Sequence, residues 1–171
     1  MSGNRITVSL FVLLAVVAAL VFFKWHAAAP LAPTSVGGCG SYATTTVSIG
    51  AAQVQAEIAD TDCKRELGLS YRNSLAGGSG MLFVFPNDGF YAFWMKDMAF
   101  PLDMVWVGTD LSVVGVAKSV SPATYDASDP QKSQTFGGNW LAEYVIELPA
   151  GFADAYGVKV GTKIFFSAKS L

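Results

Sequence analysis

The chain has 171 residues, with 11 lysines and arginines against 13 aspartates and glutamates, so its formal net charge is −2. This length suits one domain with a leader and leaves little room for a second folded domain. Hydrophobic residues make up 52% of the sequence, and the excess is concentrated in the first thirty residues. The part after Lys24 carries nine basic and thirteen acidic residues, a formal charge of −4, with its lysines scattered. This balance argues against nucleic acid as a partner.

An apolar segment covers residues 6–23, between Arg5 and Lys24. A helix rises about 1.5 Å per residue, so this segment reaches most of the way across a hydrocarbon core about 30 Å thick. It is longer than the apolar part of a typical signal peptide, which favours a retained anchor. Small residues at 27–29 leave a cleaved signal peptide as the alternative. Residues 1–25 are therefore predicted as a membrane anchor or signal segment, and both readings place the rest of the chain outside the cytoplasm.

The two cysteines, Cys39 and Cys63, both fall in the exported part. An oxidising compartment lets such thiols pair, so we predict a disulfide that ties the entry segment of the domain to its first helix. Two alternatives stay open. The thiols are unrelated, with Cys63 simply a small residue in a helix, or Cys39 is a lipidation site, although it lies far beyond the apolar run.

Residues 26–43, rich in alanine, proline, glycine and serine, are predicted as a flexible spacer, and residues 44–171 as one domain. A hairpin around Gly50 opens the domain. Asp60 or Thr61 is expected to cap the first of two short helices. The predicted helices cover residues 62–67 and 150–157, and the predicted strands cover residues 44–50, 52–60, 81–85, 90–95, 102–107, 111–116, 143–149 and 162–167.

These elements predict an α+β fold that is mostly β, with about seven short strands and two short helices. Several strands are apolar at consecutive positions, so neither face of the sheet can be wholly exposed to water. A small barrel or a sandwich-like domain, following an N-terminal transmembrane or signal helix, is the expected architecture.

Four motifs stand out along the domain: GLSYR at residues 68–72, GMLFVFP at 80–86, FWMKDMAFPLD at 93–103 and YVIELPAG at 144–151. Together they resemble the bacterial and archaeal domain-of-unknown-function 192 family over nearly the whole exported part. The resemblance implies a compact β-rich fold, often behind a signal or anchor segment, and no established biochemical activity. Members of the family usually read FWMKNT, whereas this chain has Asp97 and Met98, which adds a negative charge beside Lys96 and removes a hydroxyl.

The only histidine, His26, lies in the predicted spacer. The domain therefore lacks the residues for Ser-His-Asp or Cys-His catalysis and for histidine-based zinc sites, and two cysteines are too few for a cysteine-rich metal site. Core packing explains Met95 and Met98 better than a copper site does. We predict neither a metal nor a cofactor, and any catalysis must use carboxylates, lysine, arginine, tyrosine or hydroxyls.

A polar cluster in an apolar setting, formed by Arg72, Lys96 and Asp103 with Trp94 beside them, predicts a ligand pocket at the mouth of the barrel. Pro101 cannot donate to a sheet ladder, which places Asp103 near a strand edge. Arg72 or Lys96 would bind an anionic group, and Trp94 would stack on the ligand. The alternative is structural: Asp103 pairs with Arg72 or accepts from backbone N–H groups, because charges beside buried strands need partners.

Three functions fit these residues. The first is a membrane-tethered extracytoplasmic binding or accessory module, whose partners are the membrane, through the N-terminal helix, and an envelope ligand or protein. The second is a carboxylate-dependent hydrolase of an envelope glycan or other polymer, with Asp97, Asp103 and Glu143 as candidate catalytic residues. Glu143 and Glu147 lie on the same face of one predicted strand, and either could complete an acid–base pair. The third is a structural partner of another envelope protein.

Overall fold

The computed structural model describes residues 38–166, so the predicted anchor and most of the predicted spacer lie outside the described residues. Within this part the chain forms one seven-stranded sheet, ordered β5-β4-β6-β3-β2-β1-β7, and two short α-helices. The strands are β1 (Thr44–Ile49), β2 (Ala52–Ala59), β3 (Ser79–Phe93), β4 (Leu102–Val107), β5 (Val113–Val120), β6 (Phe136–Pro149) and β7 (Ile164–Phe166). The helices are α2 (Asp62–Leu67) and α3 (Phe152–Ala155), with 3-10 turns η1 (Pro122–Thr124) and η2 (Pro130–Lys132). Across residues 38–166, no helix combines the length and apolar character that crossing a membrane requires.

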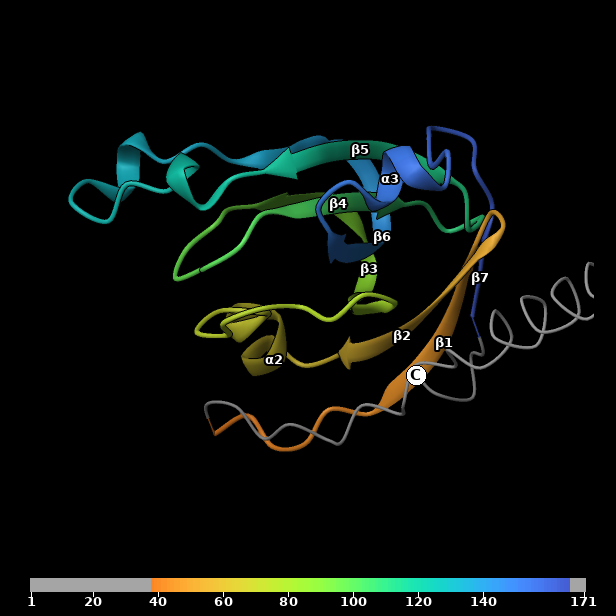
Figure 1. Ribbon diagram of the computed structural model, residues 1–171, viewed down its shortest axis with the longest axis horizontal. Helices are drawn as coiled ribbons and strands as arrows, with labels where there is room; N and C mark the ends of the chain where they lie inside the picture. Colours follow the sequence, from red (N-terminus) through yellow and green to blue (C-terminus); the bar gives the residue numbers. More distant parts are fainter. Residues whose placement is uncertain (1–37, 167–171) are drawn as a thin grey trace, which may run out of the picture. The chain divides into compact units, whose positions relative to one another are not determined.

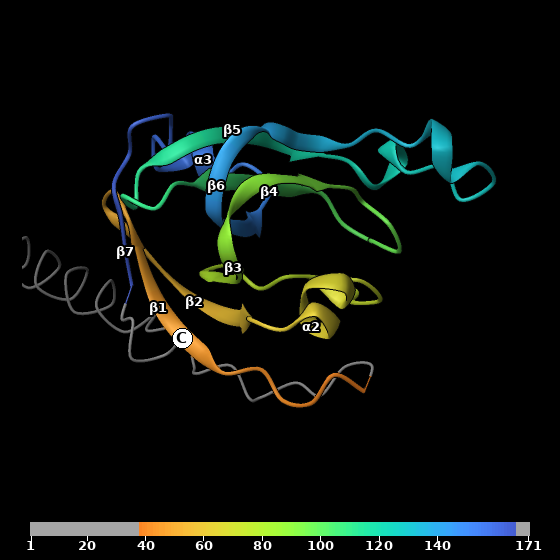
Figure 2. The same cartoon turned by 180° about the vertical axis from the view of Figure 1, so that it is seen from behind.

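The sheet curls into a half-barrel, with β1 and β2 on one side and β4 and β5 on the other (Figures 1 and 2). Its edge strands meet at one end, where Ser112 and Lys163 form a single bridge just before β5 and β7. The mostly β domain of seven strands and two short helices is confirmed for the described part of the chain. The predicted small barrel or sandwich-like domain is found in part: the sheet forms a half-barrel, in which β7 has only three residues and pairs with β1 alone among the named strands.

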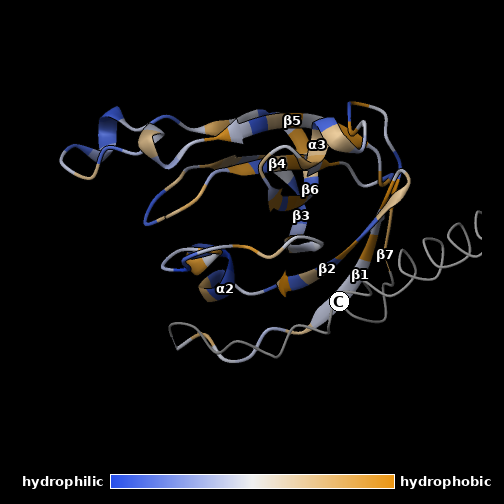
Figure 3. Cartoon of the chain, viewed as in Figure 1, coloured by the Kyte–Doolittle hydropathy of each residue, from blue (hydrophilic) through white to orange (hydrophobic). Residues whose placement is uncertain are grey.

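Both faces of the central strand β4 are buried, as the consecutive apolar positions predict. Every residue of β4 is buried, and its side chains alternate between two hydrophobic clusters. Val105 and Val107 belong to one cluster, whereas Met104 and Trp106 belong to the other. Figure 3 shows hydrophobic colouring along most of β4, while α2 is largely hydrophilic. The half-barrel therefore has a core on each side of its sheet.

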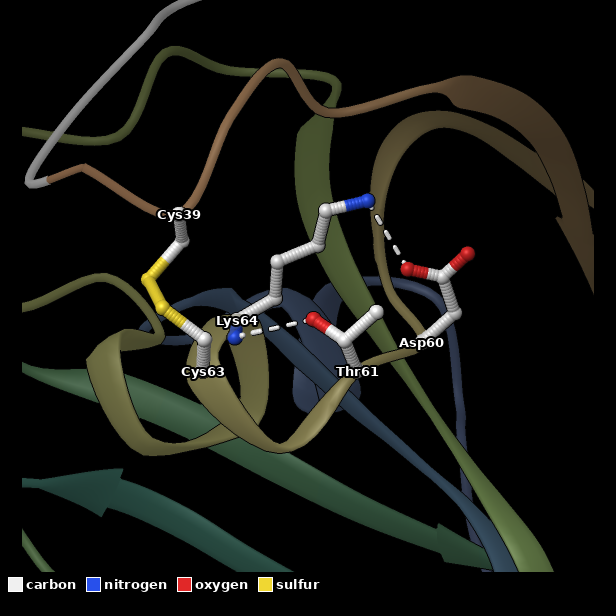
Figure 4. The surroundings of a disulfide bond; sticks show 5 residues. All are labelled: Cys39, Asp60, Thr61, Cys63 and Lys64. Atoms are coloured by element: carbon white, nitrogen blue, oxygen red, sulfur yellow. Dashed lines mark hydrogen bonds and ion pairs between the residues drawn. A yellow bond between two sulfur atoms is a disulfide. The ribbon is translucent and has the colours of Figure 1, made fainter.

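The first helix begins and ends where the sequence predicts. The Thr61 hydroxyl accepts a hydrogen bond from the backbone N–H of Lys64 at 3.3 Å, and Gly68 ends the helix with a φ of 51°. Cys63, in the first turn, forms a disulfide with Cys39, so the predicted pairing is confirmed (Figure 4). This bond indicates an oxidising compartment outside the cytoplasm.

We expect replacement of both Cys39 and Cys63 by alanine to lower the free energy of unfolding by about 3 kcal/mol, because the bond closes a loop across 24 positions of sequence. Urea denaturation of the full chain measures the difference. Addition of a reductant should lower the stability of the wild-type chain by a similar amount and leave the double variant unchanged. Equal urea midpoints for the two chains under oxidising conditions would contradict this role.

Strand β3 runs through Pro86, whereas the sequence predicts a strand that ends at residue 85. Val84 pairs with Tyr144 and Gly89 with Ala142, so residues 85–88 of β3 face a single residue of β6. Proline is tolerated there because the bulge removes the need for its missing N–H donor. One long bent strand therefore replaces the two predicted for residues 81–85 and 90–95.

Strand β6 starts at Phe136, seven positions before the strand predicted for residues 143–149. Gly137 adopts a φ of 79°, and a Cβ atom at this position would lie 2.4 Å from Cε2 of Trp106. A glycine is required both by this backbone conformation and by the close approach of the indole ring. The glycine pair 137–138 looks like a loop in the sequence, whereas it lets the strand pass close over Trp106.

Candidate functional site

A pocket of about 520 Å³ lies between α2, the loop that follows α2, and the later part of β3. Six of its lining residues are aromatic, and they come from a few neighbouring segments rather than from scattered positions. They are Tyr71, Phe83, Phe85, Tyr91, Phe93 and Trp94. A site of this size accepts a small organic molecule.

The bulge in β3 shapes the aromatic wall. Phe85 lies at the start of the bulge and Tyr91 in a second register shift, between Phe90 and Ala92, and the two rings stack with centroids 3.5 Å apart. The Tyr91 hydroxyl donates a hydrogen bond to the backbone oxygen of Asn87 at 2.7 Å, which fixes the turn between them. Phe93 packs edge-on against Phe83 at 4.9 Å. These contacts hold the rings in place in the absence of a ligand.

The rim of the pocket is formed by two loops that hydrogen bonds join. The backbone N–H of Tyr71 donates to the backbone oxygen of Asp97 at 2.9 Å, and the Tyr71 hydroxyl donates to the Asp97 carboxylate at 2.8 Å. Ser70 adds a bond to the backbone oxygen of Lys96 at 3.0 Å. Tyr71 and Asp97 both have left-handed backbone angles, with φ of 63° and 57°. Such conformations are costly for residues other than glycine and cluster at ligand sites.

Glu147, on β6, is the most unusual group in the pocket. It pairs in register with Met81 of β3 and Met104 of β4, and only 5% of it is exposed. Within residues 38–166 no group donates a hydrogen bond to its carboxyl oxygens. Burial raises the pKa of this carboxyl to about 8, and the charge of Arg72 acts in the opposite direction. Glu147 is therefore mostly a neutral acid at pH 7.

Arg72 lies beside the pocket but does not line it. Its guanidinium donates two hydrogen bonds to Glu57 of β2, at 2.7 and 2.8 Å, in a pair whose side chains are 12% and 4% exposed. The hydrogen bonds to Glu57 raise the pKa of Arg72, so it stays charged. The two terminal nitrogens are therefore bound to Glu57, whereas the buried Nε has no hydrogen-bond partner within residues 38–166.

Asp103 is fully buried and lies away from the pocket. Its carboxylate accepts hydrogen bonds from the backbone N–H groups of Ser119 at 2.7 Å, Gly151 at 3.2 Å and Ala153 at 2.7 Å. Strand β4 lies between β5 and β6, so Asp103 is not at a sheet edge as Pro101 suggested. A register shift against β5, between Leu102 and Met104, accompanies this arrangement. Asp103 therefore joins β4, β5 and the start of α3.

The structure brings together only part of each predicted residue set. Of the four predicted ligand-binding residues, Trp94 and Lys96 line the pocket, whereas Arg72 and Asp103 do not. Of the predicted catalytic candidates, Asp97 lines it, whereas Asp103 and Glu143 do not. Among residues 38–166, no three His, Cys, Asp or Glu side chains are grouped so that they could hold a metal ion.

The sequence pattern names Glu147 only as one of two glutamates that could complete an acid–base pair, and the structure shows it as a buried acid in the lining of the pocket. A signal was present in the sequence. Glu147 stands in the run YVIELP, where a charged residue has apolar neighbours on both sides. A strand buried on both faces leaves such a side chain inside the protein, which marks it as a candidate site residue.

Comparison with known proteins gives a family and a fold. A family model described as "Uncharacterized ACR" (DUF192) matches residues 44–166. The chain is similar to a solved structure of a "putative transcription regulator" from Sinorhizobium meliloti 1021, with 28% identity, a TM-score of 0.65, and coverage of 75% of this chain and 98% of that one. A protein of unknown function from Novosphingobium aromaticivorans DSM 12444 has 28% identity, a TM-score of 0.64, and coverage of 81% and 94%. No curated protein matches.

Proposed function

Because the chain belongs to the uncharacterised DUF192 family, we propose its function from the pocket itself: the domain is a binding module for a small organic ligand. The ligand presents an apolar face to the aromatic rings and one polar group to Glu147. The four motifs that carry the family resemblance all contribute residues to the pocket, including Ser70, Phe85, Trp94 and Glu147.

The observation that carries this proposal is the burial of the Glu147 carboxyl group in the lining of the pocket. Only 5% of this residue is exposed, and burial of an acid costs free energy. Such a group opening into a pocket is typical of a binding or active site, where a ligand completes its hydrogen bonds. The six rings around it supply the apolar surface that small-molecule sites use for affinity.

We further propose that the module is tethered to the membrane and works outside the cytoplasm. The apolar run at residues 6–23 supports the tether, and the Cys39–Cys63 disulfide supports the oxidising location. The ligand is then a component of the envelope or a molecule that passes through it. One similar structure is described as a putative transcription regulator. We do not propose that role for this chain, because a domain with a formal charge of −4 is poorly suited to binding nucleic acid.

A carboxylate-dependent hydrolase is the alternative function, and the protonated Glu147 is the feature that favours it, because a raised pKa suits a general acid. Hydrolysis also needs a second carboxylate across the scissile bond. Of the three predicted catalytic acids only Asp97 lines the pocket, and it is held at the rim by Tyr71. Incubation of the full chain with cell-wall glycan separates the two functions, since a binding module retains the material without cleaving it.

The binding proposal predicts that Trp94→Ala weakens ligand binding by roughly fivefold, because one ring contact is worth about 1 kcal/mol. Small aromatic and aliphatic compounds are screened against the full chain by saturation-transfer NMR, and hits are titrated. Phe90→Ala is the matched control, since Phe90 is an exposed ring outside the pocket, 65% exposed against 47% for Trp94. Hits that bind both variants equally, or the absence of any hit, would overturn the proposal.

A further inference from the structure

Resting on the binding function proposed above, we propose that the ligand is an organic amine that binds as an ammonium cation, with Glu147 as its counter-ion. The pocket then combines a single uncompensated acid at its inner end with aromatic faces around it. Three observations support this ligand class. They are the balance of charges in the lining, the ion pair between Arg72 and Glu57, and the aromatic rings of the pocket.

The charged groups at the rim cancel one another. Arg65 and Lys96 contribute two positive charges to the lining, and Glu66 and Asp97 contribute two negative charges. Arg65 also pairs at 2.6 Å with Asp62, which is exposed and lies outside the lining, so the rim has no excess of positive charge. Glu147 is the fifth acidic or basic side chain of the lining. When it ionises, the lining carries one unbalanced negative charge, which one bound cation would neutralise.

The residues packed around Glu147 do not supply that charge. Its strand neighbours Met81 and Met104 are uncharged. Arg72 is near enough to affect Glu147, but both of its terminal nitrogens are bound to Glu57, and only its buried Nε lacks a hydrogen-bond partner within residues 38–166. Once Glu147 ionises, this buried trio of two glutamates and one arginine carries a net charge of −1. A cation from outside the protein completes it.

Aromatic faces suit an ammonium group because a cation is attracted to the negative face of a ring. Two rings of this pocket already show the interaction with side-chain cations. Lys96 Nζ lies 5.8 Å from the centroid of Trp94, and Arg65 Cζ lies 5.5 Å from the centroid of Phe85. A neutral ligand such as a sugar gains from the rings but leaves the ionised form of Glu147 without a partner.

Binding of an ammonium ion should be coupled to the loss of a proton. In the empty pocket burial favours the neutral carboxylic acid, whose pKa is raised to about 8. The cation stabilises the carboxylate, so the carboxyl proton leaves to solvent while the ammonium keeps its own protons. Affinity for an amine therefore increases with pH through the neutral range, and affinity for a neutral ligand of the same shape does not.

The experiment uses benzylammonium and benzyl alcohol, a pair of probes that share a ring and differ in charge. Isothermal titration calorimetry of the full chain at pH 6 and pH 8 is expected to show benzylammonium binding at least tenfold more tightly at pH 8, because alkylammonium groups stay protonated over this range. Titration at pH 7 in two buffers of different ionisation enthalpy is expected to show release of about one proton per bound ion. Benzyl alcohol should show neither effect.

Glu147→Gln keeps the shape of the side chain and removes its charge. It is expected to abolish the pH dependence and the proton release while leaving benzyl alcohol affinity within about twofold of wild type. If this variant does not fold, the pH dependence and proton release of the wild-type chain decide the question.

Benzyl alcohol binding that depends on Trp94, with benzylammonium no tighter, would overturn the amine and leave the binding function standing. Benzylammonium binding that Glu147→Gln does not change would also overturn it. The absence of binding by both probes, together with a compound screen that finds no hit, would overturn the binding function itself.

Discussion

Asp103→Asn is expected to lower the free energy of unfolding by about 3 kcal/mol. The carboxylate accepts three backbone hydrogen bonds in a fully buried position, two at one oxygen and one at the other. An asparagine keeps one acceptor oxygen and turns an NH₂ group toward the remaining N–H donors, which leaves at least one buried donor unsatisfied. Chemical denaturation of the full chain with a two-state fit measures the loss.

Asp88→Asn is the matched control for this variant, because Asp88 is exposed and the same atoms change. It should alter stability by less than about 0.5 kcal/mol. If Asp103→Asn matched the wild type or exceeded it in stability, the carboxylate would be held at a cost to the fold. Asp103 would then need a functional explanation.

Wild-type protein is expected to lose stability as the pH rises from about 4.5 to about 8, on the order of 4 kcal/mol relative to Glu147→Gln. The ordinary pKa of the group is 4.5, and burial raises the pKa of Glu147 to about 8 in the folded chain. Between these values the folded state holds a proton that the unfolded state has released, so each rising pH unit destabilises the fold by about 1.4 kcal/mol. The contribution is complete below pH 4.5 and absent above pH 8.

Urea denaturation at half-unit pH steps follows this loss. Only the difference between wild type and Glu147→Gln is interpreted, because other groups titrate in both chains. Glu66→Gln, an exposed acid of the same pocket, is the control and should keep the wild-type slope. If the free energies of unfolding of wild type and Glu147→Gln changed in parallel with pH, the Glu147 carboxyl group would have an ordinary pKa and would be in contact with water.

Local patterns were enough to predict the elements that local interactions determine. The hairpin around Gly50 and the helix between Thr61 and Gly68 follow from alternation, a capping hydroxyl and a terminating glycine, all within a few residues. The cysteine pairing followed from the compartment that the apolar segment implies. None of these features depends on which strands are neighbours in the sheet.

Features set by distant contacts were missed. Pro86 looks like the end of a strand unless the bulge opposite β6 is known, and the partners of Asp103 lie 16 to 50 positions away in the sequence. The predicted ligand set failed to converge for the same reason. Arg72 forms an ion pair with Glu57 of β2. The inward orientation of Glu57 can be predicted only when the pairing of β2 with β3 is known.

The disulfide also decides how the domain responds to mechanical load. Tension applied upstream of Cys39 passes through the two sulfur atoms into Cys63 and therefore into α2. The stretch between the two cysteines, which contains the β1–β2 hairpin, is shielded from a pull between the two ends of the chain because the covalent bond bypasses it. Residues of α2 line the pocket, so a load on the amino-terminal side reaches the pocket wall before the hairpin. Reduction of the disulfide reverses this order and makes β1 the first strand to peel away.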